Sequence, residues 1–532
     1  MSCVLLVVLL AAVLRFAHLT QRPMHADEAV NADKFGTLLE QGRYEYDPTH
    51  FHGPSLSYLT LLPARIQGIA RYVDLDEATL RSGPAALGVL LVAASILLIP
   101  IFGEGAALAA ALLAAVSPAM VFYSRDFIHE TLLVCFAGGA LISLFRYLRK
   151  PGAGWAVAVG VFAGLMYATK ETAVIAFVAL ALGGALNVAF ETWRGEGGPL
   201  PRTQPRWAHV LMGSLAASLV AVIFFSSWFS HPRGIIDSFQ AYRTYFGMAG
   251  GGSLHRHPWH YYLDLLLFSN SPGSPVWTEG LIVVLAIVGF VAGLGRKGIP
   301  GVDKGLLRVL GFYTVIMVVI YSPIPYKTPW CLLGFLHGMT LLAGVGLMRL
   351  LQVCTTRGAR GVAVMLFVAA AAHLGWQAWA GSSRFDADPR NPWVYAHTSR
   401  DVYTIVRQVE DMARAHPDGR AMPVQVITRE NMWPLPWYLR RFTGVRWSTA
   451  VLDGVPNAPV ILVTPDMEPA LARKLYDVAP PGERELYVNV FSRRVELRPQ
   501  VEVRAYAAKT FWDEYRQRDA NVPAPAPGRA RR

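Results

Sequence analysis

The sequence predicts a mainly α-helical, polytopic membrane protein with about eleven transmembrane helices and a small C-terminal α/β domain outside the cytoplasm. Three observations lead to this prediction. The 532 residues are 53% hydrophobic and only 16% charged, whereas soluble domains carry about 25% charged residues. Long apolar runs fill residues 1–380, while residues 381–532 have the composition of a soluble domain. Basic residues gather in alternate short loops between the apolar runs.

Eleven apolar runs approach the length of about 20 residues that a helix needs to span a bilayer. The first could pass for the core of a signal peptide, but it has no basic flank and no small-residue cleavage site, so we expect it to remain as a helix. The runs cover residues 2–18, 84–102, 106–123, 130–147, 153–169, 172–190, 208–229, 277–295, 306–322, 330–348 and 361–380.

The loops after the fourth, sixth, eighth and tenth runs carry 13 basic residues. These alternate loops lie on one side of the membrane, which the positive-inside rule identifies as the cytoplasm. The formal charge of +12 therefore indicates topology and not a nucleic-acid partner. This orientation predicts a multi-pass protein of the cell membrane with a cytoplasmic N-terminus and the C-terminal domain outside. The basic residues are Arg146, Arg149, Lys150, Arg194, Arg202, Arg206, Arg296, Lys297, Lys304, Arg308, Arg349, Arg357 and Arg360.

Two outer loops, residues 20–83 and 230–276, are long, so we expect the chemistry on the outer face. In the first loop, residues 56–70 are too short and interrupted to span, and they predict a helix along the membrane interface. The same loop begins with Met24-His25-Ala26-Asp27-Glu28. Adjacent carboxylates near a membrane can act as a general base, as metal ligands or as partners of a basic residue. A solvated acidic loop is the alternative.

Three further outer helix ends carry ionisable residues, where desolvation is costly. They supply the cations Arg125, Lys170 and Lys327 and the carboxylates Asp126 and Glu130. Cations beside apolar helices suit a lipid phosphate, whose head is anionic and whose tail needs hydrocarbon. A nearby carboxylate could deprotonate an acceptor hydroxyl or stabilise positive charge at a sugar carbon. Together these groups predict sugar transfer from a polyprenyl-phosphate donor.

Many histidines also fall on the predicted outer side, among them His25 and His52, which are candidates for substrate contact. Binding of a divalent metal by histidine and carboxylate stays open as an alternative. Interfacial histidines bonded to loop backbone are the preferred interpretation, so no metal ligand and no cofactor is assigned. The cysteines show no metal-type spacing, and none lies in the C-terminal domain, which therefore has no disulfide framework.

The C-terminal domain, residues 381–520, alternates between helical and strand patterns. Strands are predicted over 424–428 and 460–464, helices over 401–415, 434–441 and 468–476, and a hairpin from 487–491 and 495–498. The aromatic segment 431–438 offers Trp433 and Trp437 for contact with a sugar, although packing onto the membrane part is the slightly preferred interpretation. The Pro/Ala/Arg-rich tail, residues 521–532, is predicted to be disordered.

The acidic pair after the first helix, the Arg81–Pro84 entry to the second and the Ser-Arg-Asp segment after the third resemble the GT-C superfamily of membrane glycosyltransferases. Within it the chain is similar to the dolichyl-phosphate-mannose protein mannosyltransferases (glycosyltransferase family 39) and to the lipid A aminoarabinose transferases. The His-x-Asp-Glu loop and the Trp-Pro-Leu-Pro-Trp-Tyr segment further resemble the flippase-activity-associated membrane proteins.

The resemblance implies inverting transfer of a hexose or pentose on the outer face, with Asp27 as the catalytic carboxylate and Glu28 beside it. It also implies that Lys170 and Lys327 hold the donor phosphate. Relatives often place an acid five residues after the arginine, where this chain has Glu130, yet Asp126 directly adjoins Arg125. Either could fill the second acidic role.

The expected partners are the lipid-linked donor, membrane lipids and an acceptor of unknown class. Two other hypotheses remain at this stage. The chain could be a non-catalytic flippase partner or transporter component, although a transport path should also show ionisable residues at mid-membrane. It could also be an assembly factor that binds an enzyme through its outer domain.

Overall fold

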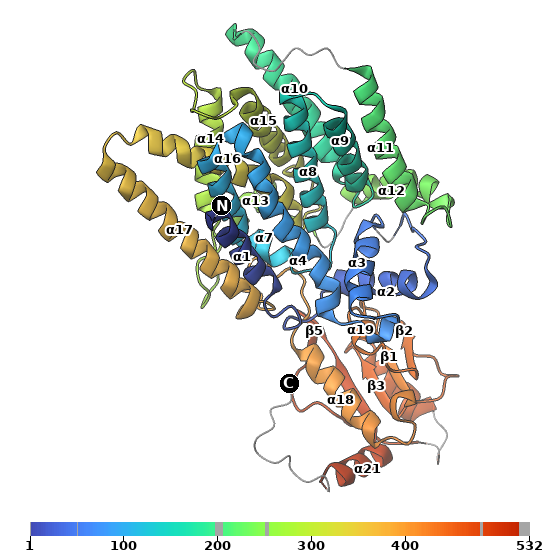
Figure 1. Cartoon of the computed structure of the whole chain (residues 1–532). Helices are drawn as coiled ribbons and strands as arrows, with labels where there is room; N and C mark the ends of the chain where they lie inside the picture. The colour runs from blue at the N-terminus through green and yellow to red at the C-terminus, as the bar shows by residue number, and fades with distance from the viewer. Residues whose placement is uncertain are drawn as a thin grey trace. The chain divides into compact units, whose positions relative to one another are not determined.

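The computed structural model describes residues 2–49, 52–196, 206–250, 255–478, 482 and 484–520. The predicted tail, 521–532, lies outside the described residues. The chain forms two compact units (Figure 1). The helical unit comprises Met1–Gln21 and Asn31–Tyr395, and the C-terminal unit comprises Arg22–Val30 and the chain from Ala396 onward. These units divide the chain differently from the predicted domains 1–380 and 381–520, which stay a prediction.

Seven described helical segments are long and apolar enough to cross a membrane, and four shorter apolar helices accompany them. Together they coincide with the eleven predicted runs, although the number of spans stays a prediction. The long segments are Glu77–Phe102 (α4, Glu77–Ala94, continued by η2, Ser95–Leu98, and α5, Ile99–Phe102), α8 (Glu130–Arg149), α10 (Ala173–Arg194), α11 (Trp207–Phe225), α15 (Lys304–Tyr321), Pro329–Val353 (η3, Pro329–Leu332, and α16, Leu333–Val353) and α17 (Arg357–Ser383). The shorter ones are α1 (Ser2–Phe16), α6 (Glu104–Val116), α9 (Ala153–Tyr167) and α14 (Gly280–Leu294).

The run predicted over 106–123 is interrupted in the structure. Helix α6 ends at Val116 and a short helix, α7 (Pro118–Tyr123), follows it. Proline has no backbone N–H and clashes with the preceding turn, so Pro118 opens a new helix rather than continuing the old one. The Ser117 hydroxyl accepts from the Met120 N–H and caps that helix.

Along the chain, shorter helices occur between the apolar ones, among them α3 (Ser55–Ile66). It confirms a helix within the segment predicted over 56–70, and its position along the membrane interface stays a prediction. The others are α2 (Ala26–Gln41), whose first turn belongs to the C-terminal unit, η1 (Tyr72–Asp74), α12 (Arg233–Gly250) and α13 (Tyr261–Leu267).

Glycines bring several helices into close backbone contact. A Cβ on Gly346 of α16 would lie 2.0 Å from the Leu285 carbonyl oxygen of α14, and one on Gly160 of α9 would lie 2.0 Å from the Gly213 oxygen of α11. In a membrane, small residues drive helix association because they let backbones approach. The pairs α14–α16 and α9–α11 therefore depend on glycine.

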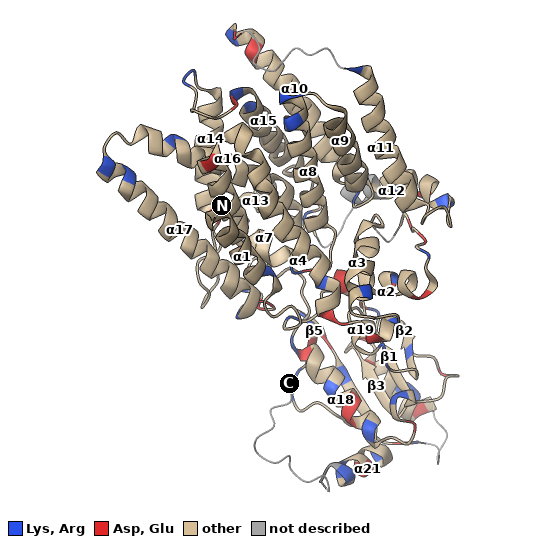
Figure 2. Ribbon diagram, viewed as in Figure 1, with Lys and Arg blue, Asp and Glu red and all other residues tan. Residues whose placement is uncertain are grey.

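Charged side chains of the helical unit gather mainly at the helix ends, while the middle of the bundle is apolar (Figure 2). At the end formed by the α10 C-terminus and the α15 N-terminus, the buried Arg308 pairs with Glu191 at 2.8 Å and with Glu196 at 2.9 Å. The Nε of Arg308 donates to Asn187 Oδ1 at 2.8 Å. The charge of this buried guanidinium is thus fully matched by acceptors.

The C-terminal unit contains a five-stranded sheet in the order β2-β1-β3-β7-β4 and a separate pair, β5-β6. Strands β2, β1 and β3 are parallel, and β7 is antiparallel to both β3 and β4. The strands are β1 (Val424–Ile427), β2 (Val445–Ser448), β3 (Val460–Val463), β4 (Tyr487–Asn489), β5 (Glu496–Arg498), β6 (Val501–Glu502) and β7 (Arg504–Ala508). The helices are α18 (Asp401–Ala415), η4 (Gly419–Ala421), α19 (Leu435–Tyr438), α20 (Glu468–Ala472), its continuation η5 (Arg473–Val478) and α21 (Lys509–Ala520).

Helices cover both faces of this sheet. Apolar residues of α18, α19 and α21 pack against alternate residues of β1 and β3, including Val426 and Leu462. The intervening residues Ile427, Ile461 and Val463 pack against α20 and η5. This alternation follows from the pleat of a strand buried on both faces. The predicted α/β class of this region is confirmed.

The predicted hairpin between 487–491 and 495–498 is wrong. Strand β4 pairs with β7, with Tyr487 opposite Ala508, and β5 pairs with β6. Both observed pairs use strands from residues 501–508, a stretch that carried no strand prediction.

Candidate functional site

The segment 22–30 belongs to the C-terminal unit; it leads into α2 and contains the first turn of that helix. Glu28, three residues after His25, accepts from the His25 backbone N–H at 2.9 Å, which is half of a capping box at the helix N-terminus. Glu28 is fully buried, whereas the Asp27 side chain is 58% exposed. The structure therefore gives Glu28 a capping contact and leaves Asp27 accessible to a substrate.

Three contacts fix this segment to the rest of the C-terminal unit. The Met24 N–H donates to the Tyr438 hydroxyl at 2.8 Å, and the Thr398 hydroxyl donates to the Met24 carbonyl at 2.6 Å. The His25 ring stacks on His397 with centroids 5.5 Å apart. Asp27 thus projects from an anchored first turn. His25, a predicted substrate contact, is itself buried.

The two tryptophans predicted to contact a sugar differ in exposure. Trp437 is fully buried, and the Arg440 guanidinium lies 3.7 Å above its ring centre. Trp433 is only partly buried, and its carbonyl accepts from Arg498 at 2.9 Å. Of the two, only Trp433 presents part of its surface to solvent.

In the helical unit, Lys170 and Glu130 form a buried ion pair. Lys170 lies in the turn between α9 and α10, and Glu130 begins α8. Beside the pair is a cavity of about 20 Å³, room for about one water, lined in part by Tyr313, Tyr321 and Trp330. The structure brings together one predicted phosphate-binding cation and one predicted acid.

Lys327 is buried in a different environment. Its ammonium donates to the backbone carbonyls of Ile324 and, at 3.2 Å, His257. Burial lowers the pKa of Lys327. Within the described ranges no carboxylate forms a salt bridge with it, so its charge is stabilised by backbone dipoles.

Residues 255–257 hold Lys327 in place through an antiparallel bridge to residues 325–327. The Lys327 N–H donates to the His255 carbonyl at 3.0 Å. The rings of His255 and His257 both bond the Tyr395 hydroxyl, at 2.7 Å and 3.0 Å. The backbone around Lys327 is therefore fixed from two sides.

Arg125 donates to carbonyls at the C-terminal end of α1, those of Leu14 at 3.0 Å and Arg15 at 3.3 Å. These carbonyls have no partner within their own helix, so Arg125 acts as a cap. Burial and the nearby Arg81 lower the pKa of Arg125 to about 10. Its neighbour Asp126 is also buried.

His52 belongs to a histidine and carboxylate group beside Lys170. Its Nδ1 lies 2.7 Å from Glu171 Oε2, and the Tyr46 hydroxyl donates to Glu171 Oε1 at 3.0 Å. Burial alone would raise the pKa of Glu171. The charge of His52 and the hydrogen bonds from His52 and Tyr46 have the larger effect, so the pKa is lowered. The ring of His129 lies 5.2 Å from that of His52. Burial lowers the pKa of His129 well below the usual value.

The chain is similar to known proteins in part of its sequence and in its fold. The family described as dolichyl-phosphate-mannose-protein mannosyltransferase matches residues 65–230, less than half of the chain. No curated protein matches. ArnT from Cupriavidus metallidurans, solved bound to undecaprenyl phosphate, is similar over 96% of this chain and 98% of its own, with a TM-score of 0.61 and 16% identity.

The archaeal oligosaccharyltransferase AglB from Archaeoglobus fulgidus, solved with an inhibitory peptide and a dolichol-phosphate, is similar over 92% of this chain and 72% of its own. The TM-score is 0.53 and the identity 13%. The chain has the GT-C fold. The predicted resemblance to that superfamily is confirmed at the level of fold. This fold and the long apolar helices show that the chain is a membrane protein. The narrower resemblance to flippase-associated proteins stays a prediction.

Several residues of this chain contact predicted site residues but were not themselves predicted. Glu171 adjoins Lys170 in the sequence, so its position was a signal, but its pairing with His52 depends on the approach of residues 52–55 to the turn between α9 and α10. Gly53 makes that approach, since a Cβ there would lie 2.2 Å from the Ala168 oxygen. Tyr46 and Tyr395 carried no signal in the sequence.

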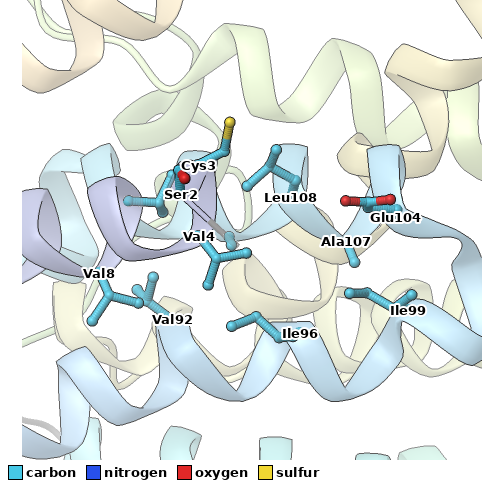
Figure 3. Close-up of a pocket in the computed structure, with 12 residues that line it drawn as sticks. Ser2, Cys3, Val4, Val8, Val92, Ile96, Ile99, Glu104, Ala107 and Leu108 are labelled. Atoms are coloured by element: carbon cyan, nitrogen blue, oxygen red, sulfur yellow. The ribbon is translucent and has the colours of Figure 1, made fainter.

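Among the described residues, no group of three or more His, Cys, Asp and Glu side chains could hold a metal ion. A divalent metal stays an untested alternative. A cavity of about 260 Å³ lies among α1, α4 with its continuation, and α6 (Figure 3). Valine, isoleucine, leucine and alanine residues line it together with Ser2, Cys3 and Glu104, and it contains none of the predicted site residues.

Proposed function

We propose that this chain is a membrane glycosyltransferase that moves a sugar from a polyprenyl-phosphate donor to an acceptor on the extracytoplasmic face. The observation that carries the proposal is the end-to-end fold similarity to ArnT, which was solved with undecaprenyl phosphate. The similarity to AglB, solved with a dolichol-phosphate, supports the same donor class. The sugar transferred is a hexose or a pentose.

Asp27 is the proposed catalytic base. In an inverting transfer the acceptor oxygen attacks the anomeric carbon, and the carbon–oxygen bond to the lipid phosphate breaks with its electron pair on the phosphate. The acceptor proton passes to a carboxylate. Asp27 is exposed on a fixed first turn, which suits this role. Glu28, buried as a cap, supports the position of Asp27.

Lys327 is the favoured group for holding the donor phosphate. Its buried ammonium contacts backbone carbonyls, so its positive charge is available to attract an anion. Lys170 is already neutralised in part by Glu130, and the guanidinium of Arg125 is engaged in capping the C-terminal end of α1. We place these two as supporting cations of the same end of the bundle, with Glu130 rather than Asp126 in the second acidic role.

The orientation follows the distribution of basic loops, which supports a cytoplasmic N-terminus and an extracytoplasmic C-terminal unit in the cell membrane. The end of the helical unit that carries Lys170 and Lys327 is then the outer end. A polyprenyl donor in the outer leaflet can reach it without crossing the bilayer.

The proposal is tested by sugar transfer from a panel of polyprenyl-phosphate sugars with the purified protein and the Asp27→Asn variant. We expect wild-type turnover and a loss of at least about 100-fold in the variant, the scale of general-base catalysis. Asp418→Asn, at an equally exposed aspartate of the same unit, should keep full activity. Lipid binding without turnover across all donors and acceptors would favour a flippase partner instead.

A further inference from the structure

The sheet of the C-terminal unit reverses its strand order between β1 and β3. The chain passes from β1 to β2 on one side of β1 and then returns to β3 on the other side, with all three strands parallel. Helix α19, between β1 and β2, packs on one face, and α20, after β3, packs on the other. In open α/β sheets, ligands bind outside the carboxyl ends of the strands at such a reversal.

A small recess, lined mainly by apolar side chains, lies at that point. Thr428 follows β1 and Thr464 follows β3, and both side chains are buried. They line a cavity of about 10 Å³ together with Asn431, Met432 and Leu435, a volume near the minimum for one water or one hydroxyl group.

Thr464 is one of three polar residues that line this recess, with Thr428 and Asn431. Its Oγ1 is buried and has no hydrogen-bond partner in the part of the chain that the structure describes. A buried hydroxyl without a partner is unfavourable, because it has lost its hydrogen bonds to water. A ligand hydroxyl placed in the recess would satisfy it.

The loops that follow β1 and β3, here called the rim of the recess, carry exposed polar residues and an aromatic ring. Arg429, Glu430, Asn431 and Asp466 are exposed, and Trp433 is partly exposed. An indole ring offers a flat apolar face to the C–H face of a sugar, and the side chains around it can bond hydroxyl groups. One hydroxyl-sized recess, one aromatic face and mixed charges suit a carbohydrate better than a phosphate or a lipid tail.

The recess is connected to Asp27 through Arg498. The guanidinium of Arg498 donates to the carbonyls of Asn431 at 2.7 Å and Trp433 at 2.9 Å, which fixes the rim loop. Asp27 and Glu430 both act electrostatically on Arg498. The proposed base and the recess therefore belong to the same compact unit, and Asp27 and the rim residue Glu430 both interact electrostatically with Arg498.

We infer that this recess and its rim bind the acceptor, and that the bound part of the acceptor is a carbohydrate. The inference rests on the proposed function, because it assigns the acceptor of that reaction. Trp433 and Thr464 are its specificity-determining residues, and Asp27 receives the proton of the hydroxyl that attacks.

The test uses the full-length protein with Thr464→Val, which keeps the side-chain shape and removes the hydroxyl, and Trp433→Ala. Their matched controls are Thr443→Val, at the amino end of β2, and Trp512→Ala on α21. Neutral disaccharides (lactose, maltose and sucrose), a threonine-containing peptide and inorganic phosphate serve as probes, in direct titration and as acceptors. We expect disaccharide binding by the wild type, weakened about three- to tenfold by each recess variant and unchanged in the controls.

In turnover, the recess variants should raise the KM for the acceptor and leave the KM for the lipid donor unchanged. Disaccharide binding with no transfer from any donor would overturn the proposed function but keep the recess as a carbohydrate site. Transfer by wild type with unaltered acceptor KM in both recess variants would overturn this inference alone. Binding of the peptide or phosphate, but of no disaccharide, would overturn it as well.

Discussion

The two buried lysines of the helical unit show how differently one residue type can be stabilised. Lys170 pairs with the carboxylate of Glu130, whereas Lys327 contacts the carbonyls of Ile324 and His257. Desolvating an ammonium costs several kcal/mol, which a carboxylate offsets better than dipoles do. The first arrangement favours a role in holding α8 and the α9–α10 turn together, and the second favours the binding of an anion.

Removing the carboxylate from Lys170 should destabilise the protein. Glu130→Gln leaves a buried ammonium beside a neutral amide, and we expect a loss of about 3–5 kcal/mol in the free energy of unfolding. The measurement is chemical or thermal unfolding of the purified protein in detergent.

The double variant Lys170→Met/Glu130→Leu removes both charges and should recover most of that loss. Lys509→Met, at a pair whose side chains are 48% and 52% exposed, should change stability by about 0.5 kcal/mol or less. A Glu130→Gln protein as stable as the wild type would show that Lys170 is not dependent on this carboxylate.

The sequence could indicate which residues carry charge at the helix ends, since ionisable side chains next to apolar runs are unusual. The capping role of Glu28 was not predicted, because the N-cap residue is His25 and not the serine or threonine of the known signature. The partners of these residues were not readable. Glu171 meets His52, and Arg125 meets the end of α1, only because distant segments fold together. The burial of Trp437 likewise depends on tertiary packing.

Secondary-structure elements were more predictable than their pairing. Hydrophobic runs indicated the eleven apolar helices found among the described residues, and helix 401–415 with its observed bounds. The break at Pro118 and the pairing of β4 with β7 were missed. A proline inside an apolar run gives only a weak local signal, and short strands of 2–5 residues choose partners through the packing of the whole sheet.

Close helix packing through glycine should be sensitive to a single methyl group. In Gly346→Ala the new Cβ would lie 2.0 Å from the Leu285 oxygen, so α14 and α16 must separate. We expect a loss of about 1–3 kcal/mol in the free energy of unfolding.

Gly184→Ala is the matched control, because this glycine of α10 has no atom within 4 Å of the site of a Cβ. There, alanine should be neutral or stabilise the helix by up to about 1 kcal/mol. Unfolding of both variants in the same detergent compares them directly. Equal stability of the two variants would contradict a dependence of the α14–α16 contact on glycine.

At the scale of the whole molecule, the fold and the orientation rest on different physics. The fold follows from apolar helices that must satisfy their own backbone hydrogen bonds in lipid, and its similarity to ArnT extends along nearly the entire chain. Orientation follows from charge in the loops, and the same ion pairs and helix contacts would exist in either orientation. The side on which Asp27 meets its substrate therefore needs a measurement in cells.

Orientation is measured with single cysteines in a variant whose four native cysteines are replaced by serine. Asp418→Cys marks the C-terminal unit, and Lys297→Cys marks the loop between α14 and α15; both positions are exposed. We expect a membrane-impermeant maleimide to label Asp418→Cys in intact cells, and Lys297→Cys only after permeabilisation. The reverse pattern would place Asp27, which belongs to the same unit as Asp418, in the cytoplasm. Transfer would then have to use donors in the inner leaflet, and the extracytoplasmic acceptor proposed above would be wrong even if the enzyme were active.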